Sequence, residues 1–167
     1  MLAYVLPEDK MDGMLVYTAD KNGEGDRYFC KDGKIQRESD DGSRDSRYPK
    51  EDNHELDVPL AVLVNGNSAS ASEVFTGAVM DYDAGIVVGT TTFGKGIVQN
   101  LIPLGDGTAI KLTTAHYYTP SGFDLHGKGL EPDVVVEMDE ELQKKAVVEL
   151  SEDNQLQAAI EAMNQAN

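Results

Sequence analysis

Hydrophobic positions along the chain fall into short runs that are separated by glycine-rich or charged turns. Residues 14–18 (MLVYT) and 26–30 (DRYFC) have strand-like composition, and the turn KNGEG between them contains two glycines. Residues 97–104 and 108–118 form a second pair of strand-like runs joined by GDG. The pattern therefore predicts two β-hairpins.

The central part of the chain has the pattern of a strand, a helix and a second strand. Residues 58–65 (VPLAVLVN) form a continuous apolar run, which is typical of a strand buried on both faces. Residues 70–82 then have helical spacing of apolar positions, and residues 86–90 (IVVGT) predict another buried strand. This order predicts a β-α-β unit with parallel pairing and an α/β fold class.

The remaining segments complete the prediction for the chain. Residues 1–6 resemble the tail of a short helix. Residues 31–57 are rich in charge, glycine and serine, so we expect a solvated loop or a ragged hairpin that is the least ordered part. Residues 134–138 (VVVEM) predict a last strand and residues 140–166 one or two helices. No repeat or second domain is evident, so we expect a single domain over residues 1–167.

The charge balance excludes some classes of partner. The chain has 30 acidic and 14 basic residues, which gives a formal net charge of -16. Such a surface repels phosphate backbones, so we expect no nucleic-acid binding and no docking on anionic lipid by charge. No run of about eighteen apolar residues is present, so no membrane span is predicted.

Metal ligands are sparse in the sequence. Cys30 is the only cysteine, so no internal disulfide and no cysteine-based zinc site can form. The three histidines, His54, His116 and His126, are far apart in the sequence and have no spacing like that of a zinc protease. We therefore predict no metal site.

The junction between the apolar run and the central helix, NGNSASASEVF, carries three serines at alternate positions: Ser68, Ser70 and Ser72. Ser70 and Glu73 fit a capping box, which is the simplest interpretation. The junction also lies at the carboxyl edge of a sheet, where α/β proteins place their sites. Amides at the helix start favour negative charge, so the Ala71 N–H could stabilise an oxyanion. The pattern leaves open both the cap and a nucleophile, and it does not choose among the serines.

A serine nucleophile needs a base, and Lys95 is the best candidate in this chain. None of the histidines has a convincing neighbouring acid. Lys95 follows a buried strand and lies between Gly94 and Gly96, which allow close approach of the backbone. Burial there would favour the neutral amine that a general base requires. The alternative is a surface lysine in a glycine turn.

Four segments, taken together, resemble the C-terminal processing peptidases, also called tail-specific proteases, which are serine proteases with a Ser–Lys dyad. The segments are NGNSASASEVF, VVGTTTFGKGIVQ, LTTAHYYTPSG and HGKGLEPDVVV. They run in register with the family from about residue 57 to residue 136, with a looser match toward both ends. This combination is highly specific, although a lone SxxE or GKG is not.

The resemblance implies roles for particular residues. Ser70 would be the nucleophile, Lys95 the general base, and Gln99 the residue that orients the lysine amine. Ser70 could begin the helix and still attack, while Ser68 and Ser72 would serve local hydrogen bonding. The implied fold is a ClpP/crotonase-like α/β core, present in part, with polypeptide substrates, an extracytoplasmic location and no cofactor or metal.

The chain departs from the family in what precedes the nucleophile. Family members carry a PDZ domain and a glycine-rich segment there, and this chain has neither, so we expect the C-terminal part of a protease core with low activity. An edge strand and the side chains of Leu2, Val5 and Leu6 would then be uncovered and favour self-association. Two alternatives are a non-catalytic peptide-binding domain and a crotonase-like acyl-CoA enzyme, although the negative charge disfavours binding of CoA phosphates.

Overall fold

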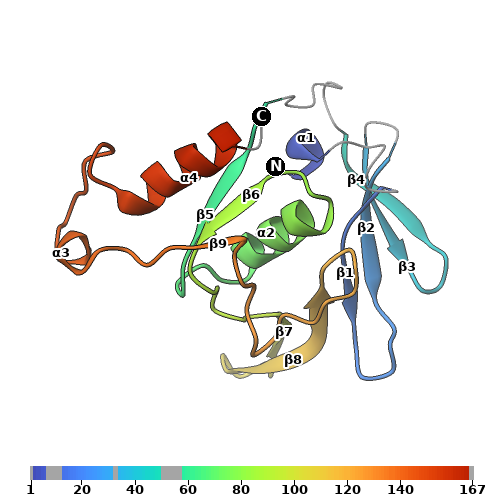
Figure 1. Cartoon of the computed structure of the whole chain (residues 1–167). Coiled ribbons are helices and arrows are strands. Elements are labelled where there is room, and N and C mark those ends of the chain that lie inside the picture. Colours follow the sequence, from blue (N-terminus) through green and yellow to red (C-terminus); the bar gives the residue numbers. More distant parts are fainter. Residues whose placement is uncertain (1, 7–12, 32–33, 50–57, 166–167) are drawn as a thin grey trace.

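The computed structural model describes residues 2–6, 13–31, 34–49 and 58–165. Two β-sheets lie on either side of the helix α2, Ala71–Asp81 (Figure 1). One described sheet has six strands in the order β4-β3-β2-β1-β8-β7, and the other has three in the order β5-β6-β9. The predicted α/β class is therefore confirmed.

The six-stranded sheet is antiparallel throughout and contains both predicted hairpins. Its strands are β1 Met14–Ala19, β2 Asp26–Lys31, β3 Lys34–Ser39, β4 Arg44–Pro49, β7 Ile97–Pro103 and β8 Ala109–Tyr118. The hairpins β1–β2 and β7–β8 are joined where β1 pairs with the end of β8, with Tyr17 opposite Tyr118. This junction continues the sheet from one hairpin into the other.

Within the charged segment 31–57, the described strands β3 and β4 form part of this sheet. Strands β3 and β4 pair with an irregular register between Ile35 and Gln36. Of the two predicted alternatives for this segment, the ragged hairpin is therefore confirmed for residues 34–49 and the solvated loop is wrong there. Opposite charges face each other across these strands, with Arg44 Nη2 3.0 Å from Glu38 Oε2. Cross-strand charge pairs of this kind stabilise a polar sheet. Residues 50–57 lie outside the described residues.

The predicted β-α-β unit is present. Strand β5 (Ala61–Val64) pairs in parallel with β6 (Ile86–Gly89), and β9 (Val134–Val135) pairs with the far side of β6. Val87 and Val88 are both fully buried although adjacent side chains of a strand point to opposite faces. Helices α2 and α4 (Asn154–Gln165) lie on opposite sides of this sheet and cover the two faces (Figure 1).

One prediction for this unit is wrong. The apolar run around β5 predicts burial on both faces, but the side chain of Leu63 is 43% exposed. The reason is topological, because β5 is the edge strand of the described three-stranded sheet. An apolar run therefore did not distinguish a central strand from an edge strand.

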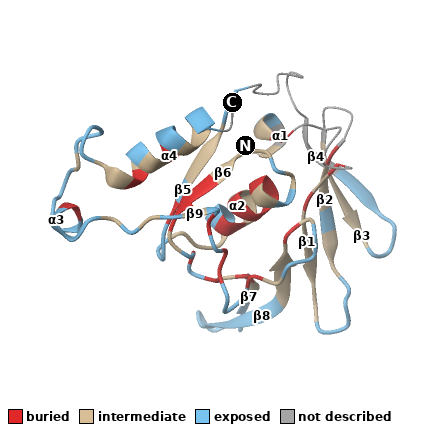
Figure 2. Ribbon diagram, in the orientation of Figure 1, coloured by how far each residue is buried: buried red, intermediate tan, exposed pale blue. Residues whose placement is uncertain are grey.

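The core beneath α2 includes the short helix α1 (Leu2–Val5). Leu6, Leu15, Cys30, Ala78 and Val79 form one buried cluster, and burial is concentrated around α2 and β6 (Figure 2). The expectation that Leu6 is uncovered is wrong, because this side chain is fully buried. Leu2 and Val5 pack partly buried against the same cluster. The burial of Leu6 removes part of the argument for self-association, which stays a prediction.

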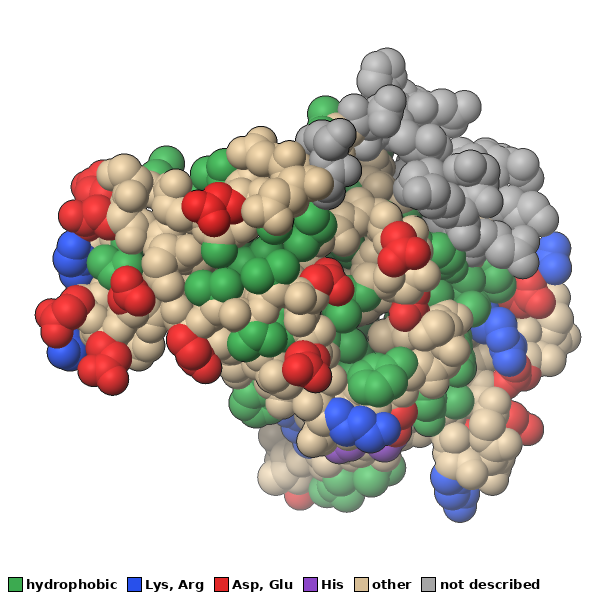
Figure 3. Space-filling view, in the orientation of Figure 1, with side chains coloured by type: hydrophobic (Ala, Val, Ile, Leu, Met, Phe, Trp, Pro, Cys, Tyr) green, Lys and Arg blue, Asp and Glu red, His purple; other side chains and the backbone are tan. Residues whose placement is uncertain are grey.

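Apolar side chains are exposed on the β7–β8 hairpin. They include Leu101, Ile102, Ile110 and Leu112, and apolar atoms show at the lower edge of the molecule over this hairpin (Figure 3). Only the end of β8 pairs with β1, so the far part of the hairpin extends past the neighbouring strand. Among the helices that the structure describes, none has the length and apolar character needed to cross a membrane.

The short helix α3 (Glu140–Gln143) and the longer α4 account for the helical C-terminal prediction. They follow β9 in the chain, and α4 returns to pack against β5 and β6. The predicted one or two helices are therefore confirmed within residues 140–165.

Candidate active site

Ser70 lies between β5 and α2 in an unusual backbone conformation. It is the N-cap of the helix, with φ 57° and ψ -111°. A positive φ is rare for a residue with a side chain and costs about 1–3 kcal/mol, and such strain clusters at functional sites. Ser68 differs, because its Oγ accepts a local hydrogen bond from the Asn65 N–H at 3.1 Å, as expected. Backbone geometry thus distinguishes Ser70 from its neighbour.

The predicted capping box is also present. Glu73 occupies the third position of α2, and its Oε2 accepts a hydrogen bond from the Ser70 N–H at 2.9 Å. The cap and the candidate nucleophile are therefore the same residue. The two interpretations of the serine-rich junction are compatible.

Glu73 does more than cap the helix, and the sequence prediction missed this. Its side chain is 0% exposed and accepts three further hydrogen bonds. Oε1 accepts from Thr92 Oγ1 at 2.6 Å and from the Gly94 N–H at 2.6 Å, while Oε2 accepts from the Lys95 N–H at 2.8 Å. The SxxE pattern marks the residue, but its distant partners become visible only in the fold.

The loop that carries Lys95 is interlocked with the loop before β9. At Gly94 the φ is +82°, and a Cβ would lie 2.8 Å from Gly129 N. At Gly129 the φ is +72°, and a Cβ would lie 2.3 Å from Thr92 O. The Gly127 N–H donates to Gly94 O at 2.9 Å across the two loops. Glycine is required because both positive φ and close backbone approach exclude a side chain. The segments GKG and HGKG form this contact together.

Ser70 and Lys95 are connected through their backbones. Both N–H groups donate to Glu73 Oε2, and the Phe93 N–H donates to Ser68 O at 3.0 Å. The Lys95 side chain is half-buried, between the two predicted alternatives. Among the hydrogen bonds of the described residues, none joins Ser70 Oγ to Lys95 Nζ. The loops are brought together, while the two side chains are not hydrogen-bonded.

Gln99 and Ala71, the other two candidate site residues, belong to β7 and α2. Gln99 is on β7, where its Nε2 donates to Thr113 Oγ1 at 3.2 Å. Ala71 is the exposed first residue of α2, so its N–H has no intrahelical acceptor. These positions are compatible with the roles expected for the two residues, which stay predictions.

A groove of about 1130 Å³ runs between the start of α2 and the six-stranded sheet. Ser70 and Ala71 contribute to one wall, and Val98, Ala115 and Tyr117 of the sheet contribute to the other. Ser70 and Ala71 therefore line a space large enough for several side chains of a bound polypeptide.

A second polar cluster lies on β8 and the loop that follows it. His116 Nδ1 is 3.5 Å from Asp124 Oδ2, and the rings of His116 and His126 are 5.0 Å apart. Two histidines that are distant in sequence are thus brought together. Burial raises the pKa of Tyr118, which stacks on Tyr17, and the nearby Asp124 charge adds to this rise.

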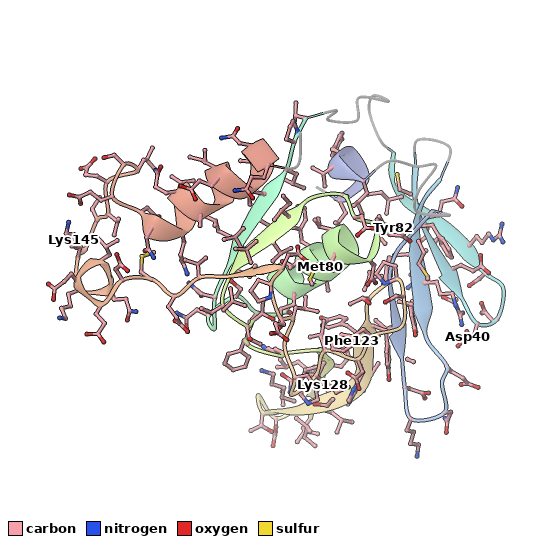
Figure 4. All side chains as sticks on the ribbon, in the orientation of Figure 1. Asp40, Met80, Tyr82, Phe123, Lys128 and Lys145 are labelled. Atoms are coloured by element: carbon pink, nitrogen blue, oxygen red, sulfur yellow. The ribbon has the colours of Figure 1, made fainter. Side chains whose placement is uncertain are left out.

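Within the described part of the chain, no group of three or more His, Cys, Asp or Glu side chains could hold a metal ion. The loop that follows β8 carries an exposed cation–π contact, in which Lys128 Nζ lies 5.2 Å from the centre of the Phe123 ring (Figure 4). Phe123 and Lys128 are exposed, whereas Gly127 and Gly129 contact the segment that carries Lys95.

Comparison with known proteins assigns the family. The model of peptidase family S41 matches residues 9–136, which is most of the chain. The chain belongs to peptidase family S41. The resemblance to C-terminal processing peptidases is thereby confirmed, and the serine-rich junction and both glycine loops all lie within the matched S41 segment.

Individual S41-like proteins give the extent of the similarity. A carboxy-terminal-processing protease of Bartonella bacilliformis is 56% identical over 79 residues, which cover 47% of this chain and 18% of that protein. The structure of a photosystem II D1 C-terminal processing protease has a TM-score of 0.58 at 36% identity and covers 81% of this chain and 30% of that one.

A lipoprotein from Streptococcus agalactiae shares the fold, with a TM-score of 0.53 at 21% identity over 81% of this chain and 43% of that chain. The S41 chain described here therefore spans less than a fifth of the curated relative and less than half of either solved structure.

Proposed function

We propose that the protein is a serine endopeptidase that cleaves polypeptides near their C-termini, with Ser70 as nucleophile and Lys95 as general base. One observation carries this proposal. The strained Ser70 faces a groove, and its backbone and that of Lys95 bond the same oxygen of Glu73. Membership of peptidase family S41 and the name of the Bartonella relative support it.

The proposed reaction proceeds through an acyl-enzyme. Ser70 Oγ attacks the scissile carbonyl carbon while Lys95 Nζ takes the hydroxyl proton. The Ala71 N–H donates to the oxyanion. The lysine returns the proton to the departing amine, and water then hydrolyses the ester by the same base. Catalytic hydrogen bonds often tighten only when substrate is bound, so the absence of a direct Ser70–Lys95 bond is compatible with this sequence.

The setting of this activity is part of the proposal. Residues 1–167 would form one domain, the C-terminal part of a protease core, working outside the cytoplasm on polypeptide substrates without a metal or cofactor. Gln99 now donates a hydrogen bond to Thr113 Oγ1 and would exchange this partner for the Lys95 amine in the active arrangement. No observation favours an acyl-CoA enzyme over this activity.

A serine-directed fluorophosphonate tests the nucleophile. We expect the reagent to modify the complete protein at Ser70, as located by mass mapping, because an activated serine reacts while ordinary serines do not. Ser70→Ala should remove both the modification and peptide hydrolysis. Ser151→Ala, at an exposed serine in the turn before α4, is the control and should react like the parent. Modification of another serine, or hydrolysis by Ser70→Ala, would show that the assignment is wrong.

Replacing Gln99 with alanine tests its orienting role. An amide cannot act as a base in the working pH range but can hydrogen-bond an amine, so we expect turnover to fall about tenfold or more while the fold is kept. Its described hydrogen bond to Thr113 is exposed, so the free energy of unfolding should change little. Gln157→Ala, which removes an exposed glutamine with one described side-chain hydrogen bond, is the control. Parent turnover in Gln99→Ala would contradict the role.

A further inference from the structure

The buried carboxylate of Glu73 lies between the two loops that carry the proposed catalytic residues. It is fully buried, and each of its four described hydrogen bonds has Glu73 as the acceptor. Hydrogen bonds from three backbone N–H groups and one hydroxyl offset the cost of burying a charge, and the start of α2 favours it further. Burying a charge is costly, so the placement of the Glu73 carboxylate requires an explanation.

The two carboxylate oxygens of Glu73 contact different donors. Oε2 accepts from the N–H groups of Ser70 and Lys95, so one atom sets the separation of these two backbones. Oε1 accepts from Gly94 and Thr92 and holds the rest of the Lys95 loop. Glu73 is not part of the groove wall, so it reaches substrate only through its neighbours.

The contacts extend to a third segment through Thr92. Its Oγ1 accepts from the Leu130 N–H at 2.8 Å, which leaves the hydroxyl hydrogen free to donate to Glu73 Oε1. Leu130 belongs to the HGKGL loop, which interlocks with Gly94. The serine junction and both glycine loops therefore meet at one carboxylate.

We infer that Glu73, assisted by Thr92, is a positioning residue that holds Ser70 in its strained conformation and fixes the distance between the Ser70 and Lys95 backbones. The inference rests on the proposed function. Glu73 transfers no proton and touches no substrate. It acts because a displacement of about 1 Å between reacting groups can lower a rate about 100-fold.

Glu73→Gln is the direct test because it keeps the shape and removes one acceptor oxygen. Whichever way the amide is turned, its NH₂ faces an N–H donor, either Gly94 or the Ser70 and Lys95 pair. In the complete protein we expect fluorophosphonate modification of Ser70 to slow about 100-fold, and kcat for peptide hydrolysis to fall while KM is unchanged. Glu131→Gln, at an exposed glutamate next to Leu130, is the matched control and should keep the parent values.

Thr92 variants keep the test decisive if Glu73→Gln does not fold. Thr92→Val removes the hydroxyl donor and should slow modification about tenfold, and Thr92→Ser should restore the rate. A folded Glu73→Gln or Thr92→Val that reacts like the parent overturns the inference. So does an equal rise in KM and fall in kcat/KM with kcat unchanged, because that result would assign Glu73 to binding.

Hydrogen exchange separates this inference from the proposed function. The amide hydrogens of Ser70, Gly94 and Lys95 should exchange slowly in the parent and faster in Glu73→Gln, with or without enzymatic activity. If the parent does not react with the fluorophosphonate but shows this exchange pattern, the peptidase proposal is wrong and the positioning role of Glu73 is retained. If all three amides exchange at the same rate in the parent and in Glu73→Gln, the positioning role of Glu73 is itself wrong.

Discussion

Lys95→Arg should lose about 100- to 10,000-fold in peptide turnover while it keeps the fold, because general acid–base catalysis contributes about this much. The guanidinium stays protonated at all working pH values and cannot accept the Ser70 proton. The backbone contact of Lys95 with Glu73 uses the N–H, so the substitution leaves that contact in place. Steady-state hydrolysis of an unstructured polypeptide by the complete protein measures the loss.

Lys128→Arg is the control for this substitution. Lys128 also lies between two glycines, in HGKGL, but its side chain is exposed over Phe123 and outside the proposed site. We expect parent turnover from this variant. If Lys95→Arg were as active as Lys128→Arg, Lys95 could not be the general base.

Gly89→Ala should lower the free energy of unfolding by about 2–6 kcal/mol, the combined range of backbone strain and overpacking. Gly89 ends β6 opposite Val64 with φ +133°, and a Cβ there would lie 1.9 Å from Val64 O. The three nearest atoms all belong to the Val64 backbone, so no flexible side chain can move to make room. Moving the Val64 backbone away from the added Cβ would also separate the ends of β5 and β6 just before the serine junction. Urea unfolding followed by circular dichroism measures the change.

Gly105→Ala is the matched control for Gly89→Ala. Its φ is +85°, but nothing lies within 4 Å of the added Cβ, so only backbone strain of about 1–2 kcal/mol remains. Equal destabilisation of the two variants would mean that the close approach of Val64 and Gly89 has no energetic effect.

Local chemistry made some features predictable. The cap at Ser70 and Glu73 follows from side-chain preferences over four residues, and the hairpins follow from short turns between strand-like runs. The β-α-β unit follows from the change of apolar period between its strands and helix. Each of these depends on interactions between residues that are near in sequence. The family resemblance added Ser70 as the choice among three serines.

Other features depended on neighbours that are distant in sequence. Leu6 is buried and Leu63 is exposed because α1 packs on the core and β5 forms a sheet edge, and neither fact is visible in an apolar run. The contact of His116 with His126 likewise requires the loop after β8 to fold back. Burial of an apolar side chain is decided by the surface opposite it, which the local pattern does not contain.

By itself, the sequence determined the α/β class, the order of the predicted elements and the capped helix, and its resemblance to the family proposed the pair Ser70 and Lys95. Only the tertiary structure decided how these two residues are held, with the strained φ of Ser70 and the four donors that converge on Glu73. The reason is that capping and strand periodicity act over a few residues, whereas a buried carboxylate is satisfied by backbone groups that only the packing of separate loops brings within hydrogen-bonding distance.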